Sequence, residues 1–388
     1  MTQHFDTFDA PARHSALVAV ASKEAAYISD WIFHHLRFGF APILVLVNRS
    51  DDATETIVRR ISRQDPRVRL LNVDSLDSGH PYTNKRIQLD AYETALQALR
   101  KELTPDSYMF CFDIDEFWTP KDFKSSIQDH LHHLGWPLKC ALNWFVPTEG
   151  PTAFAPPFQS TLSGRSTVLR KHGFQIGQSI KEIRIHRLED TNQLPTRLAC
   201  GADSPADENR SAVPPTSLAD AFLLHRMHRS VVEYVGLLGR PRPKAAELPF
   251  KSNRRGYFWI GRFETYTLDF HVAPDKLDAY HADSAEFMAQ HALTNLTRTG
   301  RYKMLERASG VLRDFDALPK DVQAQWAHIF DDVDMETLPN VLLAEWHRLD
   351  LQKRKQQPDP VAQLRDEHFG NGGGMVGRER LELPTSSV

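Results

Sequence analysis

Residues 108–118 read Tyr-Met-Phe-Cys-Phe-Asp-Ile-Asp-Glu-Phe-Trp, an apolar run followed by two aspartates one residue apart. Its first five residues form an unbroken apolar run, which is typical of a strand buried on both faces in a parallel sheet. Asp113 and Asp115 follow, and their spacing points both carboxylates to the same side. Two such carboxylates repel each other unless a cation lies between them, and oxygen ligands suit Mg²⁺ or Mn²⁺. We therefore predict a divalent-metal site at the end of this strand; the alternative is a solvated acidic turn.

The composition is that of a globular protein with a sizeable core. The chain has 388 residues, of which 41% are hydrophobic and 25% charged, enough for one large domain or two ordinary ones. The formal net charge of −3 argues against a nucleic-acid partner. No apolar run approaches the roughly 20 residues that span a membrane, and the N-terminus lacks a signal-peptide pattern. We expect a cytoplasmic protein, with peripheral association at the inner face of the membrane left open.

The chain before residue 108 alternates between strand and helix patterns. Short apolar runs alternate with segments whose apolar residues recur at spacings of three and four. Such alternation is the signature of a right-handed βαβ layer with a parallel sheet. The glycine-rich loop of dinucleotide-binding folds is missing from it. The predicted strands cover 15–21, 42–47 and 68–73, and the predicted helices cover 24–38, 53–63 and 85–101.

Polar turns follow two of these strands, at 48–52 and at 113–116. In an open parallel sheet the ligand lies beyond the carboxyl ends of the strands, so we expect the two turns to share one cleft. Residues 190–217 are polar and proline-rich, and we interpret them as a mobile loop beside the cleft or as an ordinary surface insertion. The remaining predictions are a helix at 120–134, strands at 140–146, 165–170 and 181–186, and helices at 275–294 and 317–352.

The order and spacing of these segments resemble the glycosyltransferase family 2-like proteins of GT-A fold. The likeness covers roughly residues 15–260. Three positions depart from the family's pattern: Lys23 replaces an asparagine, Val47 an aspartate and Arg229 a lysine. The matching pieces are Ser22-Lys23-Glu24, Asp30-Trp31-Ile32, Asn48 to Thr54, Phe112 to Phe117 (the Asp-x-Asp-Glu-Phe strand), Asn143-Trp144-Phe145, and His225 to Ser230 followed by Arg255-Gly256.

The resemblance implies an α/β fold of GT-A type, with a Rossmann-like, mostly parallel sheet flanked by helices and a helical C-terminal extension. We accordingly predict a glycosyltransferase domain over residues 1–295, a helical region over 296–357 and a disordered tail over 358–388. The implied activity is metal-dependent, inverting transfer of a sugar from a nucleotide-sugar donor, with a UDP-sugar expected. The acceptor would be a hydroxyl of a glycan or a lipid-linked molecule, in the synthesis of a cell-surface polysaccharide.

The resemblance also implies roles for individual residues. Mn²⁺ or Mg²⁺ would be held by Asp113, Asp115 and His225, with His228 as the substitute for His225. The nucleotide sugar would contact Glu24, Asn48, Asp52, Lys85, Asp113, Arg229 and Arg255. The two arginines would pair with its phosphates, because arginine matches phosphate geometry. Several of these residues have a structural alternative. Asn48 and Asp52 would then only shape their turn, and the two arginines would be solvated surface charges. Gln88 shares a helix face with Lys85, and Trp118 and Trp144 would either stack on sugar or belong to the core.

The catalytic base is the least defined part of this prediction. Inverting transfer needs a carboxylate to deprotonate the acceptor hydroxyl. The candidates are Glu149 and Asp190, whereas Glu116 is interpreted as structural. Two other functions stay open: a nucleotidyltransferase, against which the glycine-free segment 21–24 argues, and an inactive glycan-binding or scaffold protein on the same fold.

Overall fold

A computed structural model of the 388-residue chain describes residues 13–77, 84–186, 188–190, 194–204, 214–240, 250–251, 253–261 and 264–356. The chain divides into two compact units, residues 1–345 and 346–388, and the first contains the sheet and the helices that pack on it. The domain boundaries predicted after residues 295 and 357 stay predictions. The tail predicted at 358–388 lies outside the described residues.

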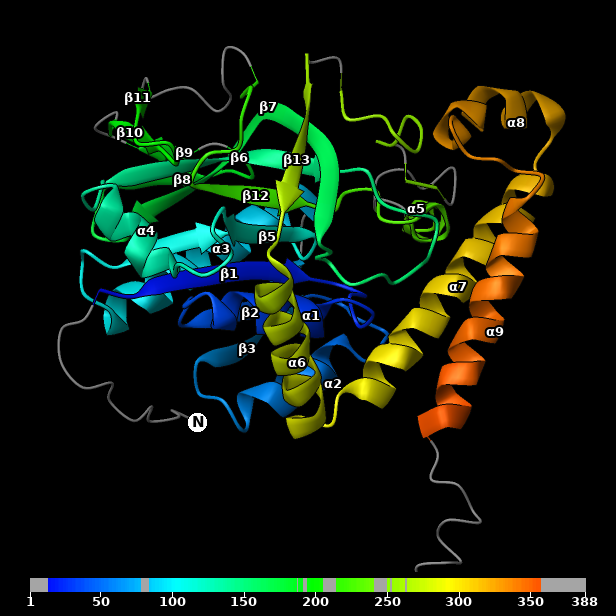
Figure 1. Cartoon of the computed structure of the whole chain (residues 1–388), viewed down its shortest axis with the longest axis horizontal. Coiled ribbons are helices and arrows are strands. Elements are labelled where there is room, and N and C mark those ends of the chain that lie inside the picture. The colour runs from blue at the N-terminus through cyan, green and yellow to red at the C-terminus, as the bar shows by residue number, and fades with distance from the viewer. Residues whose placement is uncertain are drawn as a thin grey trace, which may run out of the picture. The chain divides into compact units, whose positions relative to one another are not determined.

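Four parallel strands form the first half of the main sheet, in the order β3-β2-β1-β4, of which Figure 1 labels the first three. In the register, Leu17 of β1 pairs with Ile43 of β2 on one side and with Phe110 of β4 on the other. Three of the strands, β1, β2 and β4, are buried because helices cover both faces, as the apolar runs predicted, whereas β3 at the edge of the sheet is mostly half-buried. Their bounds are β1 Ser15–Ala21, β2 Ile43–Val47, β3 Val68–Asn72 and β4 Tyr108–Cys111.

The helices between these strands pack on opposite faces of the sheet. Tyr92 and Leu96 of α3 belong to one core cluster with Met109 of β4. On the other face, the His35 ring of α1 lies 5.8 Å from the ring of Phe112, centroid to centroid. The helices are α1 Ile28–Arg37, α2 Thr54–Ser62 and α3 Asn84–Glu102, close to their predicted ranges.

The second half of the sheet contains antiparallel pairs. The long strand β7 runs antiparallel to both β4 and β6 and so joins the two halves. Gly173 permits this contact, because a Cβ there would lie 2.1 Å from the ring of Phe110. The strands are β5 Glu116–Pro120, β6 Lys139–Pro147, β7 Thr161–Gln175, β10 Thr196–Leu198, β11 Asp203–Ser204, β12 Ala221–His225 and β13 Tyr266–His271; β8 Ile180–Ile183 and β9 Leu188–Asp190 form a separate pair.

Two predicted segments need correction. The helix expected at 120–134 begins only at residue 127, because residues 116–120 form a strand that pairs with β12. Ser126 then caps helix α4 (Ile127–His133) by accepting from the Asp129 N–H. The loop expected at 190–217 contains the short strands β10 and β11, while its residues 191–193 and 205–213 lie outside the described residues.

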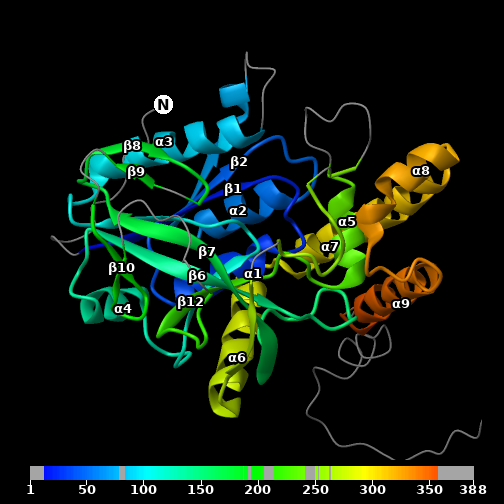
Figure 2. The same ribbon diagram turned by 90° about the horizontal axis from the view of Figure 1, so that it is seen from above.

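Helices follow the sheet toward the C-terminus. Helix α7 packs against α5 (Figure 2), so closely that a Cβ on Gly236 would lie 2.3 Å from Met304 Sδ. The predicted helix over 317–352 is split into α8 and α9. No helix among the described residues is long and apolar enough to cross a membrane. The bounds are α5 Val231–Leu238, α6 Pro274–Gln290, α7 Thr294–Asp316, α8 Lys320–Trp326 and α9 Leu338–Gln356. The predicted α/β class, a Rossmann-like sheet flanked by helices, is confirmed.

Candidate functional site

A cavity of about 900 Å³ lies at the carboxyl ends of β1, β2 and β4. The strand order turns back at this point, since β2 and β3 lie on one side of β1 and β4 on the other. In open α/β sheets this switch in strand order is where ligands bind. The cavity brings together the turns after β2 and β4, and six of the predicted site residues line it: Glu24, Asn48, Asp113, Asp115, His225 and Arg229.

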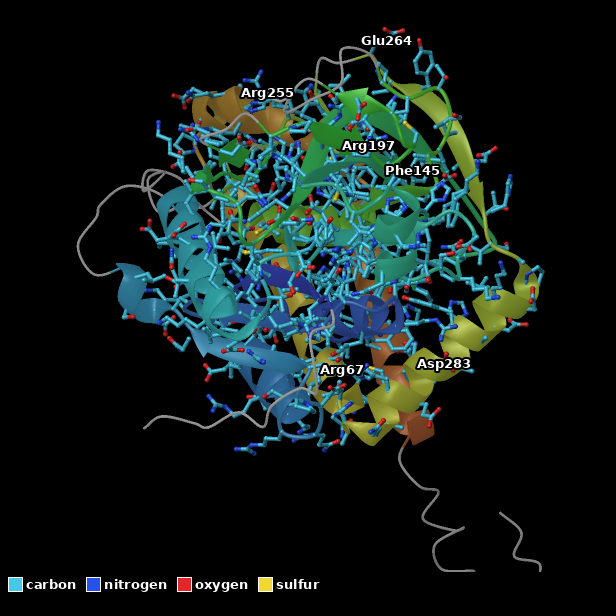
Figure 3. All side chains as sticks on the ribbon, turned by 90° about the vertical axis from the view of Figure 1, so that its left-hand side faces the viewer. Arg67, Phe145, Arg197, Arg255, Glu264 and Asp283 are labelled. Atoms are coloured by element: carbon cyan, nitrogen blue, oxygen red, sulfur yellow. The ribbon has the colours of Figure 1, made fainter. Side chains whose placement is uncertain are left out.

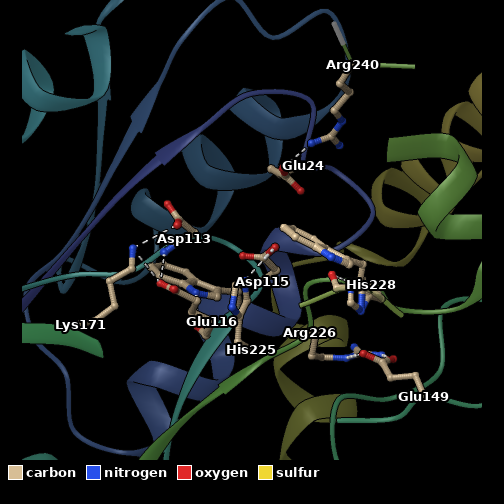
Figure 4. Close-up of polar contacts among 12 residues, drawn as sticks. Glu24, Asp113, Asp115, Glu116, Glu149, Lys171, His225, Arg226, His228 and Arg240 are labelled. Carbon is tan, nitrogen blue, oxygen red and sulfur yellow. Dashed lines mark hydrogen bonds and ion pairs between the residues drawn. The ribbon is translucent and has the colours of Figure 1, made fainter. Parts of the chain in front are cut away.

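Asp115 and His225 face each other across the end of the sheet. The antiparallel pairing of β12 with β5 sets His225 opposite Glu116, and His225 Nε2 lies 3.6 Å from Asp115 Oδ2 (Figure 4). Burial raises the pKa of Asp115, but His225 and two neighbouring arginines lower it by more, so this pKa lies well below its usual value. Asp115 is therefore ionised at any physiological pH.

Asp113 has different partners from Asp115. Lys171, in the middle of β7, places its Nζ 3.0 Å from Asp113 Oδ2 and 3.1 Å from Glu116 Oε2 (Figure 4). Gln88 Nε2 donates to the other oxygen of Asp113 over 2.9 Å. Burial raises the pKa of Glu116, whereas it lowers that of Lys171; the two carboxylates outweigh burial at Lys171 and hold its pKa well above the usual value. Lys171 thus lies between Asp113 and Glu116, whereas the sequence predicted a cation between Asp113 and Asp115, and that prediction stays a prediction.

A wall of cations forms another side of the cavity. Six basic residues line the cavity, against three acidic ones. The guanidinium carbon of Arg229 lies 3.5 Å from the centroid of the Tyr27 ring, and Arg240 pairs with Glu24 (Figure 4). Burial, aided by two neighbouring guanidinium groups, lowers the pKa of Lys251 to about 7. The basic lining residues are Arg49, Arg184, Arg229, Arg240, Lys251 and Arg254, and the acidic ones are Glu24, Asp113 and Asp115.

Left-handed backbone recurs beside the cavity. Lys23, Arg49 and Arg229 follow β1, β2 and β12, with φ of 60°, 44° and 58°. This conformation costs a non-glycine residue about 1–2 kcal/mol. A positive φ turns the chain sharply after each strand. All three residues at these turns are positively charged.

Several predicted site residues lie away from the cavity lining. Glu149 forms a buried ion pair with Arg226, and Asp190 pairs with buried Lys139 over 3.1 Å. The structure does not bring either carboxylate together with Asp115, and their role as a base stays a prediction. Arg255 is exposed (Figure 3), with its guanidinium carbon 5.8 Å from the ring of Trp259.

The other predicted residues have mixed positions. Asp52 shapes its turn, since its Oδ1 accepts from the Thr54 N–H over 2.9 Å. Trp118 is fully buried and belongs to the core, whereas Trp144 lines the cavity with its ring 4.1 Å from that of His225. His228 Nε2 lies 3.1 Å from the Trp259 carbonyl oxygen and does not line the cavity. Lys85 lies in the first turn of α3, but its side chain is outside the described residues.

The sequence interpretation gave no role to five of the basic residues that line the cavity, nor to Lys171, which contacts Asp113. The five are Arg49, Arg184, Arg240, Lys251 and Arg254. Lys171 gave no signal, because one lysine in a strand resembles a solvent-facing residue. The basic run at 251–255 was visible in the sequence, but Arg255 was chosen from it, and Arg254 and Lys251 line the cavity.

Comparisons with known proteins give distant likenesses. No family profile matches this chain, and no curated protein matches it. Among solved structures, the mannosyltransferase PcManGT from Pyrobaculum calidifontis, in complex with GDP-Man and Mn²⁺, aligns over 95% of this chain and 92% of its own, with 13% identity and a TM-score of 0.30. TarS from S. aureus aligns over 42% of this chain, with 10% identity and a TM-score of 0.25, and the chain spans only 28% of the length of TarS. At these values neither likeness says what this chain does.

Proposed function

We propose that this chain is a glycosyltransferase that takes its sugar from a nucleoside-diphosphate donor with the help of a divalent cation. One observation carries the proposal. At the switch in strand order, a single cavity places the Asp115–His225 pair beside a wall of arginine and lysine side chains. Such a cavity suits a ligand that is anionic and binds metal, and the diphosphate of a nucleotide sugar is both.

The charge balance of the cavity supports an anionic ligand. Arg229, Lys251 and Arg254 lie close enough to Asp115 or to one another to shift pKa values. Crowded cations repel each other, and an anion between them removes that repulsion. A diphosphate leaving group carries its charge at the moment when the glycosidic bond of the donor breaks. Fixed cations at that position stabilise the transition state more than the ground state.

A divalent cation fits the donor atoms that this chain offers. Asp115 is an ionised carboxylate, and the Nε2 of the His225 ring lies 3.6 Å from its Oδ2. The described part of the chain contains no group of three candidate protein ligands. Mg²⁺-like ions are commonly held by one or two side chains plus substrate phosphates and water, which suits a two-ligand site. When bound, the cation would supply Lewis-acid stabilisation of the departing diphosphate.

The finer assignment follows the same site. The cavity volume of about 900 Å³ is at the upper end of the usual range for ligand sites, with room for a donor and the first sugar of an acceptor. We assign the donor as a UDP-sugar and the acceptor as a glycan or lipid-linked hydroxyl used in a cell-surface polysaccharide. Transfer proceeds with inversion. Trp144 lines the same cavity, although its ring is largely covered by the rings of His186 and His225.

Calorimetry tests the donor site. UDP and GDP are titrated with and without Mn²⁺ into the wild type, Asp115→Asn and the control Asp278→Asn, whose carboxylate is exposed on α6. We expect Mn²⁺ to strengthen binding of UDP at least tenfold in the wild type and the control, and not in Asp115→Asn. Binding of neither nucleotide under any metal condition would overturn the proposal.

A turnover assay separates the reaction classes. The protein is incubated with a panel of UDP-sugars and Mn²⁺, and released UDP and pyrophosphate are measured. UDP release that depends on Asp115 supports sugar transfer or donor hydrolysis at this site. A second incubation, with a nucleoside triphosphate and a sugar phosphate, tests for nucleotidyltransferase activity. Pyrophosphate release in this incubation, without UDP release from any sugar donor in the first, would make the chain a nucleotidyltransferase.

A further inference from the structure

A short loop, residues 256–261, presents two large aromatic side chains to solvent. Phe258 and Trp259 are 38% and 39% exposed, whereas Tyr257 and Ile260 on either side of them are buried. The loop begins and ends with a glycine at a φ of 115°, a conformation that side chains rarely adopt. The fold therefore anchors this loop at both ends and holds two apolar rings in water between the anchors.

The sheet extends this aromatic surface. Tyr266 lies on β13 and is 37% exposed, and β13 pairs with the segment of β7 around Arg165. Arg165 Nη2 donates to the Phe258 carbonyl oxygen over 2.5 Å, and the nearby Asp332 raises the pKa of Arg165, which burial lowers. Among the large apolar side chains exposed in the described ranges, the other four are leucines. The three exposed rings are called the aromatic patch: Phe258, Trp259 and Tyr266.

A cation lies beside the aromatic patch. Arg255 is exposed, with its guanidinium carbon 5.8 Å from the centroid of the Trp259 ring (Figure 3). No carboxylate of the described residues forms an ion pair with Arg255. The acidic neighbour Glu264 accepts from the Tyr266 hydroxyl over 3.1 Å instead. The patch thus combines apolar rings with a guanidinium group that is available to an anion.

The carbonyl groups of the loop are already engaged, which favours an apolar partner. Phe258 accepts from Arg165, and the Trp259 carbonyl oxygen lies 3.1 Å from His228 Nε2. An extended peptide partner is held by hydrogen bonds to such main-chain groups. A bilayer interface takes up aromatic rings without them and penalises main-chain groups that lack a partner. A guanidinium group beside the rings matches the phosphates of lipid headgroups.

We propose that the aromatic patch and Arg255 dock this protein on the surface of a bilayer that contains anionic lipids. The loop continues into the cavity wall, because Arg254 lines the cavity and Tyr257 Oη donates to the carbonyl oxygen of the cavity residue Arg229 over 2.7 Å. A bilayer at the patch therefore lies beside the cavity. A lipid-linked acceptor would reach the cavity from there, and this last step rests on the proposed function.

Vesicle flotation tests the docking surface. The full chain is mixed, without nucleotide or acceptor, with vesicles of phosphatidylcholine or of phosphatidylcholine and phosphatidylglycerol in equal amounts. We expect the double variant Phe258→Ser, Trp259→Ser to bind the mixed vesicles at least tenfold more weakly than the wild type. The control Leu343→Ser removes an exposed leucine of α9 and should bind like the wild type. Arg255→Gln should weaken binding to the mixed vesicles about fivefold and leave the weaker binding to phosphatidylcholine unchanged.

Lipids with brominated acyl chains test insertion without the serine variant. They should quench the tryptophan fluorescence of the wild type, and Trp259→Phe should bind equally well with most of that quenching lost. Absence of vesicle binding, or unchanged binding of the double serine variant, would overturn the proposal. So would self-association that the serine variant loses in light scattering without any vesicle binding, since the patch would then join two copies of this chain. Because neither nucleotide nor acceptor is present, failure here leaves the donor site to the calorimetry described above.

Discussion

Replacing Lys251 by arginine should change how nucleotide binding depends on pH. Lys251 is half-buried in the cavity wall, where its N–H donates to the Leu238 carbonyl at the end of α5 over 2.8 Å. Burial and then Arg254 and Arg240 lower its pKa to about 7, while Asp115 and Glu24 oppose them. An unperturbed lysine titrates near 10.4, so this side chain loses its charge at far lower pH than usual.

The size of the effect follows from the pKa. Below about pH 7 Lys251 is charged and attracts a diphosphate; above it, the charged fraction falls tenfold per pH unit. At pH 9 about 1% of Lys251 is charged. If only the charged form binds UDP, the affinity for UDP falls by up to about 100-fold between pH 7 and pH 9. This is about 2.7 kcal/mol, at about 1.36 kcal/mol per pH unit. Arginine stays charged throughout this range, so Lys251→Arg should lose this fall.

The assay is calorimetry with UDP from pH 6 to pH 9, in two buffers of different ionisation enthalpy. An anion raises the pKa of Lys251, so the wild type should take up a proton on binding near pH 8, and Lys251→Arg should not. The control is Lys121→Arg, an exposed lysine after β5. Ionisation of UDP itself is common to all variants and cancels in the comparison. Identical pH profiles for the wild type and Lys251→Arg would mean that the charge of Lys251 does not contribute to binding of UDP.

Three further substitutions test the structure around the site. Gly173→Ala would set a methyl group 2.1 Å from the Phe110 ring, and urea unfolding should show a loss of about 1–3 kcal/mol; no loss would mean that β7 does not approach β4 so closely. Arg226→Met leaves Glu149 buried without its counter-ion. This should lower the free energy of unfolding by about 3–5 kcal/mol, and replacing Glu149 by methionine as well should restore most of the lost stability. Asparagine tolerates the left-handed φ of 44° at Arg49, so Arg49→Asn should raise stability by about 1 kcal/mol while weakening UDP binding; unchanged stability would argue against strain there.

Local sequence patterns were enough to predict the parallel half of the sheet and the edge of the sheet at which the cavity lies. Apolar runs and helical spacing are local patterns, and each segment from residue 15 to residue 111 follows its own pattern because both faces of the sheet are covered. The Asp113–Asp115 turn was equally visible, since polar residues that end a buried strand must lie at an edge of the sheet.

The pairing of charges around the cavity depends on contacts between residues that are far apart in the sequence. Lys171 reaches Asp113 across 58 positions, and Arg240 reaches Glu24 across 216. No local pattern encodes these pairs, because a buried charge is stabilised by whichever opposite charge the packed elements bring to it. The antiparallel course of β7 brings the lysine into the turn, and the turn then has its cation before a metal arrives. The same packing holds Glu149 and Asp190 in ion pairs of their own, which their positions in the sequence did not indicate.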